Sequence, residues 1–317
     1  MSFSTLPSNA SLVNIGTHSL ALYTHGPERS SSKDPVVLFV SGVASSSLNW
    51  AAVVRLLPPS LRSYTYDRSG YRNSELSPLK PTAENIALEL FHLIEKAPIS
   101  NPLIIVGHSW AGVLINEFIA LTGNGPHIAG LVLVDANHET APQVLNVNDP
   151  VLLAIAEGVE PYSGMGMESE HKLTQEEWDM FRNDESTEKA KLIGQKEDFE
   201  YAPSFETLRK KELGKKQPLV GDKPVYVIGG MRSRDWTGLY KAGVEKGNGT
   251  EEQRSHVREL IRTADEKSEG LMKEFLKLST KSKLVFAHES GHFVQLTQPD
   301  IVVNGVKWVL DNLQTSS

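Results

Sequence analysis

Ser109 stands in a sequence context that suits a nucleophile. The segment LIIVGHSWAGVLINEFIA, residues 103–120, passes from an apolar stretch through a cluster of small residues and resumes with apolar residues at helical spacing. Gly107 and Ala111 lie two residues on either side of Ser109, and small side chains are what a sharp turn needs to hold a serine exposed. The glycine-x-serine-x-small string is weak alone, so its place between a strand and a helix carries the prediction. The alternative is a serine that only caps the following helix.

His292 is the candidate for the base that such a serine needs. A serine hydroxyl is a poor nucleophile at neutral pH unless a histidine, held in one tautomer by a carboxylate, takes its proton. His292 lies in AHESGHFVQLTQPD, after the last expected strand and before the last expected helix, and it follows a glycine. The alternative is a buried histidine that is bonded to a backbone carbonyl.

Short apolar segments alternate with helical patterns and would position these two residues. Most of the segments are apolar without alternation, the pattern of strands that are buried on both faces of a parallel sheet. Residues 11–27 predict an antiparallel pair of strands ahead of this series, and residues 299–313 predict a closing helix. The core strands are expected at residues 35–40, 63–67, 102–107, 128–135, 223–230 and 282–287.

The alternation stops between Asp135 and Lys223, where the sequence is polar, helix-prone and interrupted by prolines. We therefore expect a helical cap inserted into the sheet domain. A second polar excursion, residues 236–279, separates the last two strands, and its charge runs are expected to be solvated helix faces. The expected organisation is a first part of the core at residues 1–140, the cap at 141–218 and a second part of the core at 219–317.

Five segments resemble, in chain order, the landmarks of the α/β-hydrolase superfamily. They are SGVASSSLNW at the oxyanion-hole turn, YDRSGYRNS at the Asp-Arg-x-Gly-x-Gly-x-Ser loop, GHSWAG at the nucleophile elbow, LVLVDANHE at a strand ending in an acid, and SGHFVQLTQPD at the histidine loop. Ser41 replaces a usual histidine, Arg72 a usual glycine and Ala111 the elbow's second glycine. The resemblance covers nearly all of the chain outside the cap. It implies an α/β fold with a mostly parallel, doubly wound sheet (the α/β-hydrolase fold) and an inserted helical cap.

The resemblance leaves two candidates for the acid that holds the histidine. Most family members carry it in a Gly-x-x-Asp turn after the strand that here reads KPVYVIGG, but the third residue after Gly230 is Ser233, and Asp235 lies two residues further on. A subset, the haloalkane dehalogenases among them, places the acid at the preceding strand end, where this chain has Asp135. We expect Asp135 to be the acid and Asp235 to be the runner-up. The alternative for Asp135 is a structural role in the first turn of the cap.

The resemblance also assigns an oxyanion hole. The negative oxygen of a tetrahedral intermediate needs preorganised N–H donors, typically worth about 3 kcal/mol each. Similarity to the family assigns these to the backbone amides of Val43 and Trp110. The side chains expected to contact substrate are those of Trp110, Met165, Met167 and Trp178; the alternative for each is packing of the cap onto the core.

Composition restricts the compartment and the partners of the chain. Its 317 residues include no cysteine, which excludes disulfides and thiolate catalysis, and no apolar run approaches the roughly 18 residues that a membrane-spanning helix needs. A net charge of −7 argues against a nucleic-acid partner. The first residues lack the basic and apolar regions of a secretory signal, so a cytoplasmic address is expected. We expect a small-molecule substrate, no metal or other cofactor, and leave the oligomeric state open.

The predicted function is hydrolysis of a carboxylic ester or lactone of a small to medium-sized apolar molecule, through an acyl-enzyme on Ser109. Haloalkane dehalogenases and the related epoxide hydrolases need a carboxylate nucleophile, so a serine at this position argues against both reactions. One alternative is a lyase or C–C bond-cleaving enzyme that uses the same triad. Another is a small-molecule receptor on an inactive hydrolase scaffold.

Overall fold

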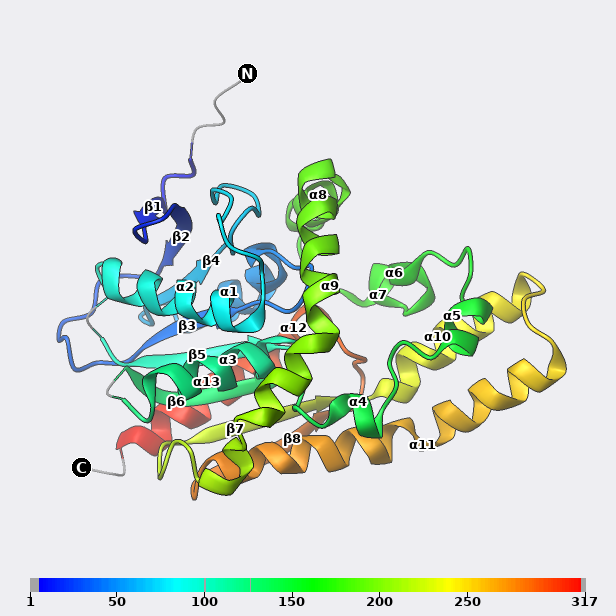
Figure 1. Ribbon diagram of the computed structural model, residues 1–317. Coiled ribbons are helices and arrows are strands. Elements are labelled where there is room, and N and C mark those ends of the chain that lie inside the picture. Colours follow the sequence, from blue (N-terminus) through cyan, green and yellow to red (C-terminus); the bar gives the residue numbers. More distant parts are fainter. Residues whose placement is uncertain (1–5, 100, 126, 315–317) are drawn as a thin grey trace.

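An eight-stranded sheet forms the centre of the computed structural model, which describes residues 6–99, 101–125 and 127–314 (Figure 1). The strand order is β1-β2-β4-β3-β5-β6-β7-β8, with β1, β2 and β4 joined antiparallel and all other neighbours parallel. This confirms the predicted mostly parallel sheet and the antiparallel pair that precedes it. The strands are β1 (Ala10–Asn14), β2 (Ser19–His25), β3 (Val36–Val40), β4 (Ser63–Tyr66), β5 (Leu103–His108), β6 (Ile128–Val134), β7 (Val225–Gly230) and β8 (Ser282–Ala287).

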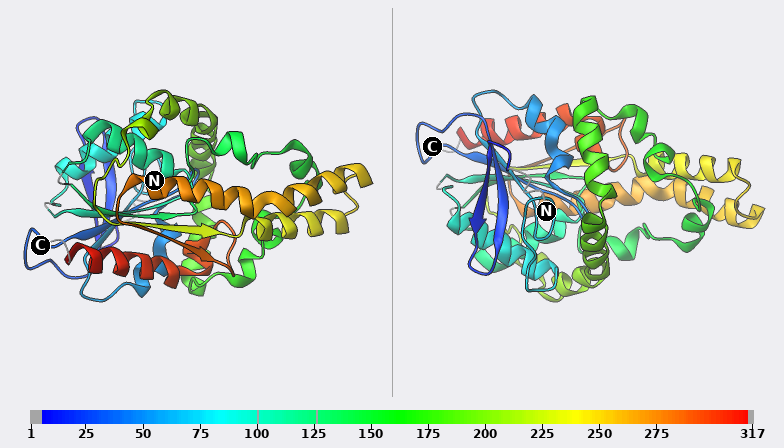
Figure 2. Two further views of the ribbon diagram at one scale, coloured as in Figure 1. Left: turned by 90° about the horizontal axis from the view of Figure 1, so that it is seen from below. Right: turned by 90° about the horizontal axis from the view of Figure 1, so that it is seen from above.

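The central strands are buried on both faces, which explains their unbroken apolar sequences. In β3, Leu38 and Val40 join one core cluster, whereas Val37 and Phe39 join the cluster on the opposite face. Helices cover both faces, so the sheet is doubly wound (Figure 2). One face carries α2 (Ala83–Lys96) and α3 (Ala111–Thr122); the other carries η1 (Ser47–Trp50), α1 (Ala51–Leu56), α12 (Val294–Thr297) and α13 (Pro299–Gln314).

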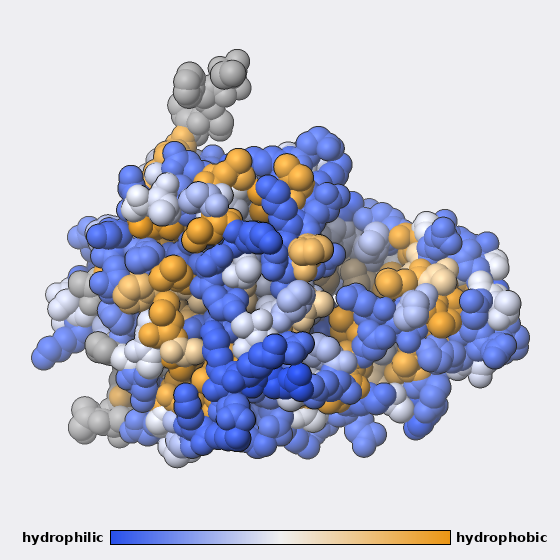
Figure 3. Space-filling view, viewed as in Figure 1, coloured by the Kyte–Doolittle hydropathy of each residue, from blue (hydrophilic) through white to orange (hydrophobic). Residues whose placement is uncertain are grey.

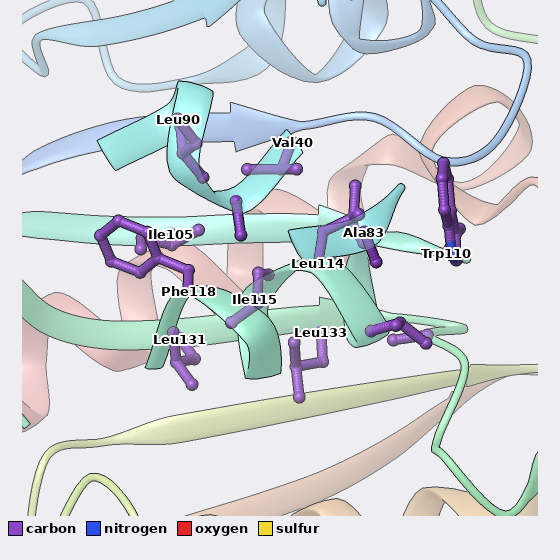
Figure 4. Close-up of a cluster of buried hydrophobic side chains, with 14 of the residues drawn as sticks. Val40, Ala83, Leu90, Ile105, Trp110, Leu114, Ile115, Phe118, Leu131 and Leu133 are labelled. Atoms are coloured by element: carbon purple, nitrogen blue, oxygen red, sulfur yellow. The ribbon is translucent and has the colours of Figure 1, made fainter. Parts of the chain in front are cut away.

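Helix α3, which follows Ser109, is anchored in the core along most of its length. Figure 4 shows Leu114, Ile115 and Phe118 of this helix packed beside side chains of β5 and β6. All three side chains are fully buried. Burial of each such side chain stabilises the fold by roughly 1.5–3 kcal/mol. The turn between β5 and α3 is therefore held between two rigid elements.

The predicted cap, residues 141–218, is a chain of helices inserted between β6 and β7. Its longest helix, α9, runs across the carboxyl ends of the central strands (Figures 1 and 2). The cap consists of α4 (Ala141–Val144), α5 (Pro150–Ile155), α6 (Pro161–Gly164), α7 (Met167–Glu170), α8 (Gln175–Ser186), α9 (Glu188–Lys210) and η2 (Leu213–Lys216).

A second helical excursion lies between β7 and β8. Helices α10 (Arg232–Glu245) and α11 (Glu251–Phe275) form a hairpin that extends away from the sheet beside α5, and η3 (Leu276–Leu278) leads into β8 (Figures 1 and 2). The sequence predicted solvated helix faces here. The charged residues Arg258, Glu259 and Arg262 of α11 are indeed exposed. Another face of the helix is packed, because Val257, Ala264 and Leu271 recur every seven residues and are buried.

The surface carries scattered apolar side chains. In the view of Figure 3 they lie among hydrophilic residues over both the sheet domain and the projecting helices. Phe199 on α9 is the most exposed of the large apolar residues that the structure describes, at 77%. No helix within the described ranges is long and apolar enough to cross a membrane.

Phe118→Ala should lower the free energy of unfolding by about 3–5 kcal/mol, because it leaves a cavity in the fully buried core between α3 and the sheet. Phe199→Ala is the matched control, since the same atoms are removed from an exposed position and the change should stay within about 0.5 kcal/mol. Urea unfolding followed by circular dichroism measures both. Equal losses in the two variants would contradict this description of the core.

Candidate active site

Ser109 occupies the strained turn that its sequence context predicts. It lies directly after β5 and before α3, with φ of 58°, a left-handed conformation that non-glycine residues rarely adopt. The surrounding space explains the small residues: a Cβ on Gly107 would lie 2.9 Å from the Cβ of Ala111, and one on Gly112 would lie 2.5 Å from the carbonyl oxygen of Asn137. Larger side chains at these positions would force the turn apart.

The structure brings His292 and Asp135 to Ser109 in a hydrogen-bonded chain. Nε2 of His292 lies 2.9 Å from Oγ of Ser109, and Nδ1 lies 2.5 Å from Oδ2 of Asp135. A carboxylate only accepts hydrogen bonds, so we infer that Nδ1 carries a proton and donates a hydrogen bond to Asp135. Nε2 is then free to accept the hydroxyl proton of Ser109. The three residues are separated by up to 183 positions in the sequence, and strand ends bring them together.

Asp135 is buried and is bound by three donors. Besides His292, the amide of Gly230 donates to its Oδ1 at 3.0 Å and Nη2 of Arg232 donates to its Oδ2 at 2.8 Å. Burial by itself would raise the pKa of Asp135, but the Arg232 charge and the hydrogen bonds from His292 and Gly230 lower it to about 2. Asp135 is therefore a carboxylate over the whole neutral range.

Asp235, the other candidate acid, also contacts His292, but through the backbone. Its Oδ2 accepts a hydrogen bond from the His292 amide at 2.8 Å. A Cβ on Gly291 would lie 1.7 Å from Oδ1 of Asp235, so only glycine fits before the histidine. Burial raises the pKa of Asp235, against the lowering effect of Arg232 and of the His292 amide. The structure thus places Asp135 at the imidazole ring and Asp235 at the loop that carries it.

His108 supports the same loop from the side of β5. Its Nε2 lies 2.9 Å from the carbonyl oxygen of His292, and its Nδ1 lies 3.2 Å from Nε2 of Gln295. Burial holds the pKa of His108 well below its ordinary value, so the ring is neutral. A neutral ring with a proton on Nε2 satisfies both contacts: it donates to the carbonyl and accepts from the glutamine.

Two backbone amides near Ser109 are suited to bind an anion. Trp110 follows Ser109 directly, and Val43 follows Gly42, on which a Cβ would lie 2.9 Å from the Cβ of Ser109. Within the described residues, we find no hydrogen bond donated by the amide of Val43 or of Trp110. These are the two positions predicted as the oxyanion hole, and that role stays a prediction.

A cavity of about 180 Å³ opens beside Asp135, between the strand ends, α9 and α11. Asn137 connects it to Ser109, because Oδ1 of Asn137 lies 3.4 Å from the Ser109 hydroxyl and accepts a hydrogen bond from Tyr201 at 3.0 Å. The sequence analysis did not predict a role in the site for Asn137, Tyr201 or Arg232. Of these, only Asn137 had a signal in the sequence, because it follows Asp135 by two residues. The apolar part of the lining is Ala136, Ala141, Pro142, Leu145, Val147, Ala202, Phe205, Leu271 and Met272.

The side chains predicted to contact substrate do not line this cavity, although the structure describes all of Trp110, Met165, Met167 and Trp178. Met167 is buried in an apolar cluster that also contains Ala52 of α1 and Leu296 of α12, and the ring of Trp178 stacks on that of His171 with centroids 4.1 Å apart. The indole of Trp110 is fully buried and donates to Oγ of Ser204 on α9 at 3.0 Å. Contact of these four side chains with a substrate therefore stays a prediction.

Within the described residues, we find no group of three or more His, Asp or Glu side chains arranged to hold a metal ion. The side-chain atoms in hydrogen-bond contact with the Ser109 hydroxyl are Nε2 of His292 and Oδ1 of Asn137. At one edge of the sheet the structure brings together a serine hydroxyl, an imidazole in contact with a carboxylate, and the two amides predicted to bind an oxyanion. Those are the parts that acyl transfer requires.

Comparison with known proteins agrees with this fold. Residues 37–304 match the model of the alpha/beta hydrolase family, and the chain therefore belongs to that family. It is 32% identical over 315 residues to a protein named as a probable transporter, efuK, of Hormonema carpetanum. That match includes 98% of this chain but spans only 44% of the relative's length.

Two further comparisons cover most of both chains. An AB hydrolase superfamily protein of Gibberella zeae is 29% identical over 300 residues, which are 92% of this chain and 91% of that protein. Among solved structures, the haloalkane dehalogenase DbeA of Bradyrhizobium elkani superposes with a TM-score of 0.62 at 16% identity, covering 97% of this chain and 99% of that one. At that identity the likeness concerns the fold alone.

Asp135→Asn should slow covalent labelling of Ser109 by a fluorophosphonate by about 10³–10⁴-fold, because an amide no longer fixes the histidine tautomer. Asp235→Asn is the matched control: its side-chain oxygen still accepts the His292 N–H, so labelling should stay within about tenfold of wild type. The measurement is the labelling rate of folded protein. A larger loss in Asp235→Asn would reverse the assignment of the acid.

The pKa of Asp135 also predicts a pH dependence of stability. A carboxyl whose pKa falls from 3.8 to about 2 on folding stabilises the native state above the unfolded value, and this contribution is lost as the pH falls through the folded value. The stability difference between wild type and Asp135→Asn should shrink by about 1 kcal/mol between about pH 5 and pH 3. Urea unfolding of both proteins at the two pH values measures it, and a constant difference would contradict the lowered pKa.

Proposed function

We propose that this chain is a serine hydrolase that cleaves a carboxylic ester or lactone without a cofactor. The observation that carries the proposal is the chain of contacts from Ser109 to His292 at 2.9 Å and from His292 to Asp135 at 2.5 Å. A serine in the elbow cannot form the ester intermediate of a dehalogenase, which requires a carboxylate nucleophile. Membership in the alpha/beta hydrolase family agrees with hydrolysis.

Acylation starts when Oγ of Ser109 attacks the substrate carbonyl carbon while Nε2 of His292 takes the hydroxyl proton. The negative oxygen of the tetrahedral intermediate accepts hydrogen bonds from the amides of Val43 and Trp110. His292 then gives its proton to the leaving alkoxide as the C–O bond breaks, and an acyl group remains on Ser109. Asp135 stabilises the imidazolium through Nδ1 during both transfers.

Deacylation repeats these steps with water as the nucleophile. His292 takes a proton from water, the hydroxyl adds to the acyl carbon, and the bond to Oγ of Ser109 breaks as the proton returns to it. A carboxylic acid leaves and the serine is regenerated. In a lactone the alcohol and the acid belong to one molecule, so the same steps open the ring.

The cavity beside Asp135 supports a small apolar substrate group. About 180 Å³ is small for a ligand pocket, and its walls are mostly apolar with Asn137, Tyr201 and Arg232 as polar groups. Asn137 is the polar side chain between this cavity and the Ser109 hydroxyl. We assign it the task of orienting the bound ester.

Ser109→Ala should lower the turnover of aryl esters by about 10⁴–10⁶-fold while circular dichroism stays unchanged, because it removes the nucleophile and leaves the turn in place. Ser169→Ala, at an exposed serine of the cap, is the control and should match wild type. The assay uses a panel of aryl esters with rising acyl length. Equal turnover in Ser109→Ala and wild type would end the proposal, as would labelling of Ser109 without turnover of any ester.

A further inference from the structure

A buried ion pair joins the cap to the sheet domain close to Ser109. Glu197 of α9 accepts hydrogen bonds from Arg68, at 2.7 Å from Nε to Oε1 and 2.8 Å from Nη2 to Oε2. Arg68 lies in the loop after β4, and the two side chains are only 3% and 2% exposed. Burial would lower the pKa of Arg68, but Glu197 raises it, so the pair is ionic. A buried pair of this kind needs a full set of hydrogen bonds to be tolerated.

All but one of the remaining hydrogen bonds of the pair are made to a single turn, residues 41–44. Arg68 donates from Nη1 to the carbonyl oxygen of Ser41 at 2.7 Å and from Nη2 to that of Gly42 at 2.6 Å. Glu197 accepts the amide proton of Ala44 at 2.8 Å. The further donor to Glu197 is the hydroxyl of Tyr71, at 2.9 Å. The turn is thus fixed on both sides of Val43.

The turn is both strained and close to Ser109. Ala44 has φ of 52°, a conformation that costs an L-residue about 1–2 kcal/mol and persists only where its surroundings enforce it. The hydrogen bond to Glu197 is made at this residue. Since a Cβ on Gly42 would lie 2.9 Å from the Cβ of Ser109, a shift of the turn changes where the Val43 amide points relative to Ser109.

One face of α9 contacts the residue that follows Val43 and the side chain of Trp110. Glu197, Tyr201 and Ser204 follow the i, i+4, i+7 spacing of a single helix face. Glu197 binds the residue after Val43, Ser204 accepts a hydrogen bond from the Trp110 indole, and Tyr201 binds Asn137. Further along the same face, a Cβ on Gly194 would lie 3.2 Å from the Cβ of Ala44, so glycine lets the helix approach the turn closely.

We propose that Glu197 is a positioning residue that fixes the Val43 amide for oxyanion binding through Arg68 and Ala44, and that the cap is thereby part of the catalytic apparatus. The inference rests on the proposed function. Without the carboxylate Arg68 loses its counter-charge. An amide in its place turns an N–H group either toward Nε of Arg68 or toward the Ala44 amide, so one of these two donors loses its acceptor. The 41–44 turn then relaxes, and the oxyanion loses a donor in the transition state while ground-state binding is kept.

The test compares an aryl ester with the matching thionoester, whose sulfur accepts hydrogen bonds weakly. Glu197→Gln should lower kcat for the ester roughly 10- to 100-fold, less than the 10²–10³ that loss of a donor costs, with little change in KM. The kcat for the thionoester should fall several times less. The ratio of the two kcat values, ester to thionoester, should therefore fall in this variant. A purely structural defect lowers both rates equally, because it reduces the amount of active protein and leaves the ratio unchanged.

Two further variants complete the test. Glu197→Asp keeps a negative charge beside Arg68, so the fold is preserved. The shorter side chain withdraws the carboxylate from the Ala44 amide, so the ester-to-thionoester ratio of kcat values should also fall. Glu117→Gln is the matched control, because Glu117 is a buried carboxylate of α3 that pairs with Lys211 at the far end of α9. Lys211 lies roughly 21 Å along the helix from Glu197. This control should keep the wild-type ratio.

An unchanged ratio in both Glu197 variants would overturn the inference, as would a wild-type kcat in folded Glu197→Gln. Either result is separate from a failure of the proposed function. In that failure wild type hydrolyses no ester, or hydrolyses it at the same rate as Ser109→Ala. Turnover that depends on Ser109 but not on Glu197 would remove this inference alone.

Discussion

The left-handed turn at Ser109 is the constraint on which the rest of the site depends. A strained φ of 58° persists because β5 and the buried face of α3 hold both ends of the turn. The same turn places the hydroxyl of Ser109 at the carboxyl edge of the sheet, within 2.9 Å of Nε2 of His292. Every other element of the site approaches this point, and glycine at 42, 107 and 112 leaves it room to do so.

Two buried carboxylates near this turn contact different parts of His292. Asp135, whose pKa is lowered to about 2, faces the ring of His292 as a permanent charge. Asp235, whose pKa is raised by burial, holds the backbone of the same residue. Arg232 lies beside both and offsets their negative charge. The imidazole is thereby fixed through its ring and its main chain, which is the preorganisation that proton transfer requires.

The cap has a second role besides covering the strand ends. Its helix α9 reaches the turn after β3, the indole that follows the nucleophile, and the loop after β6 with one face. Buried ionic and polar contacts are sensitive to small displacements, because an unpaired group in the interior costs far more than an exposed one. A displacement of α9 would therefore disturb the contacts at the 41–44 turn, Trp110 and Asn137, as well as access to Ser109.

Much of this was readable from local patterns in the sequence. Unbroken apolar runs identified the buried strands of a parallel sheet, because a strand covered on both faces has no polar side. The small residues around Ser109 and the glycine before His292 indicated the turns that the structure contains. Where another part of the chain approaches the backbone closely, only a small side chain fits, and this requirement is visible in the sequence. Residues 141–218 were predicted as a cap because the strand and helix alternation stops there, and the structure has the helices α4 to η2 in this segment.

Only the tertiary structure decided which distant groups meet. Both Asp135 and Asp235 follow strands, and the sequence could not tell which one faces the ring of His292, since that depends on how two neighbouring strand ends are placed in space. The pair of Arg68 and Glu197 spans 129 residues and has no local pattern. Substrate contact by Trp110, Met165, Met167 and Trp178 stays a prediction, because apolar side chains look the same in a sequence whether they meet a ligand or the core.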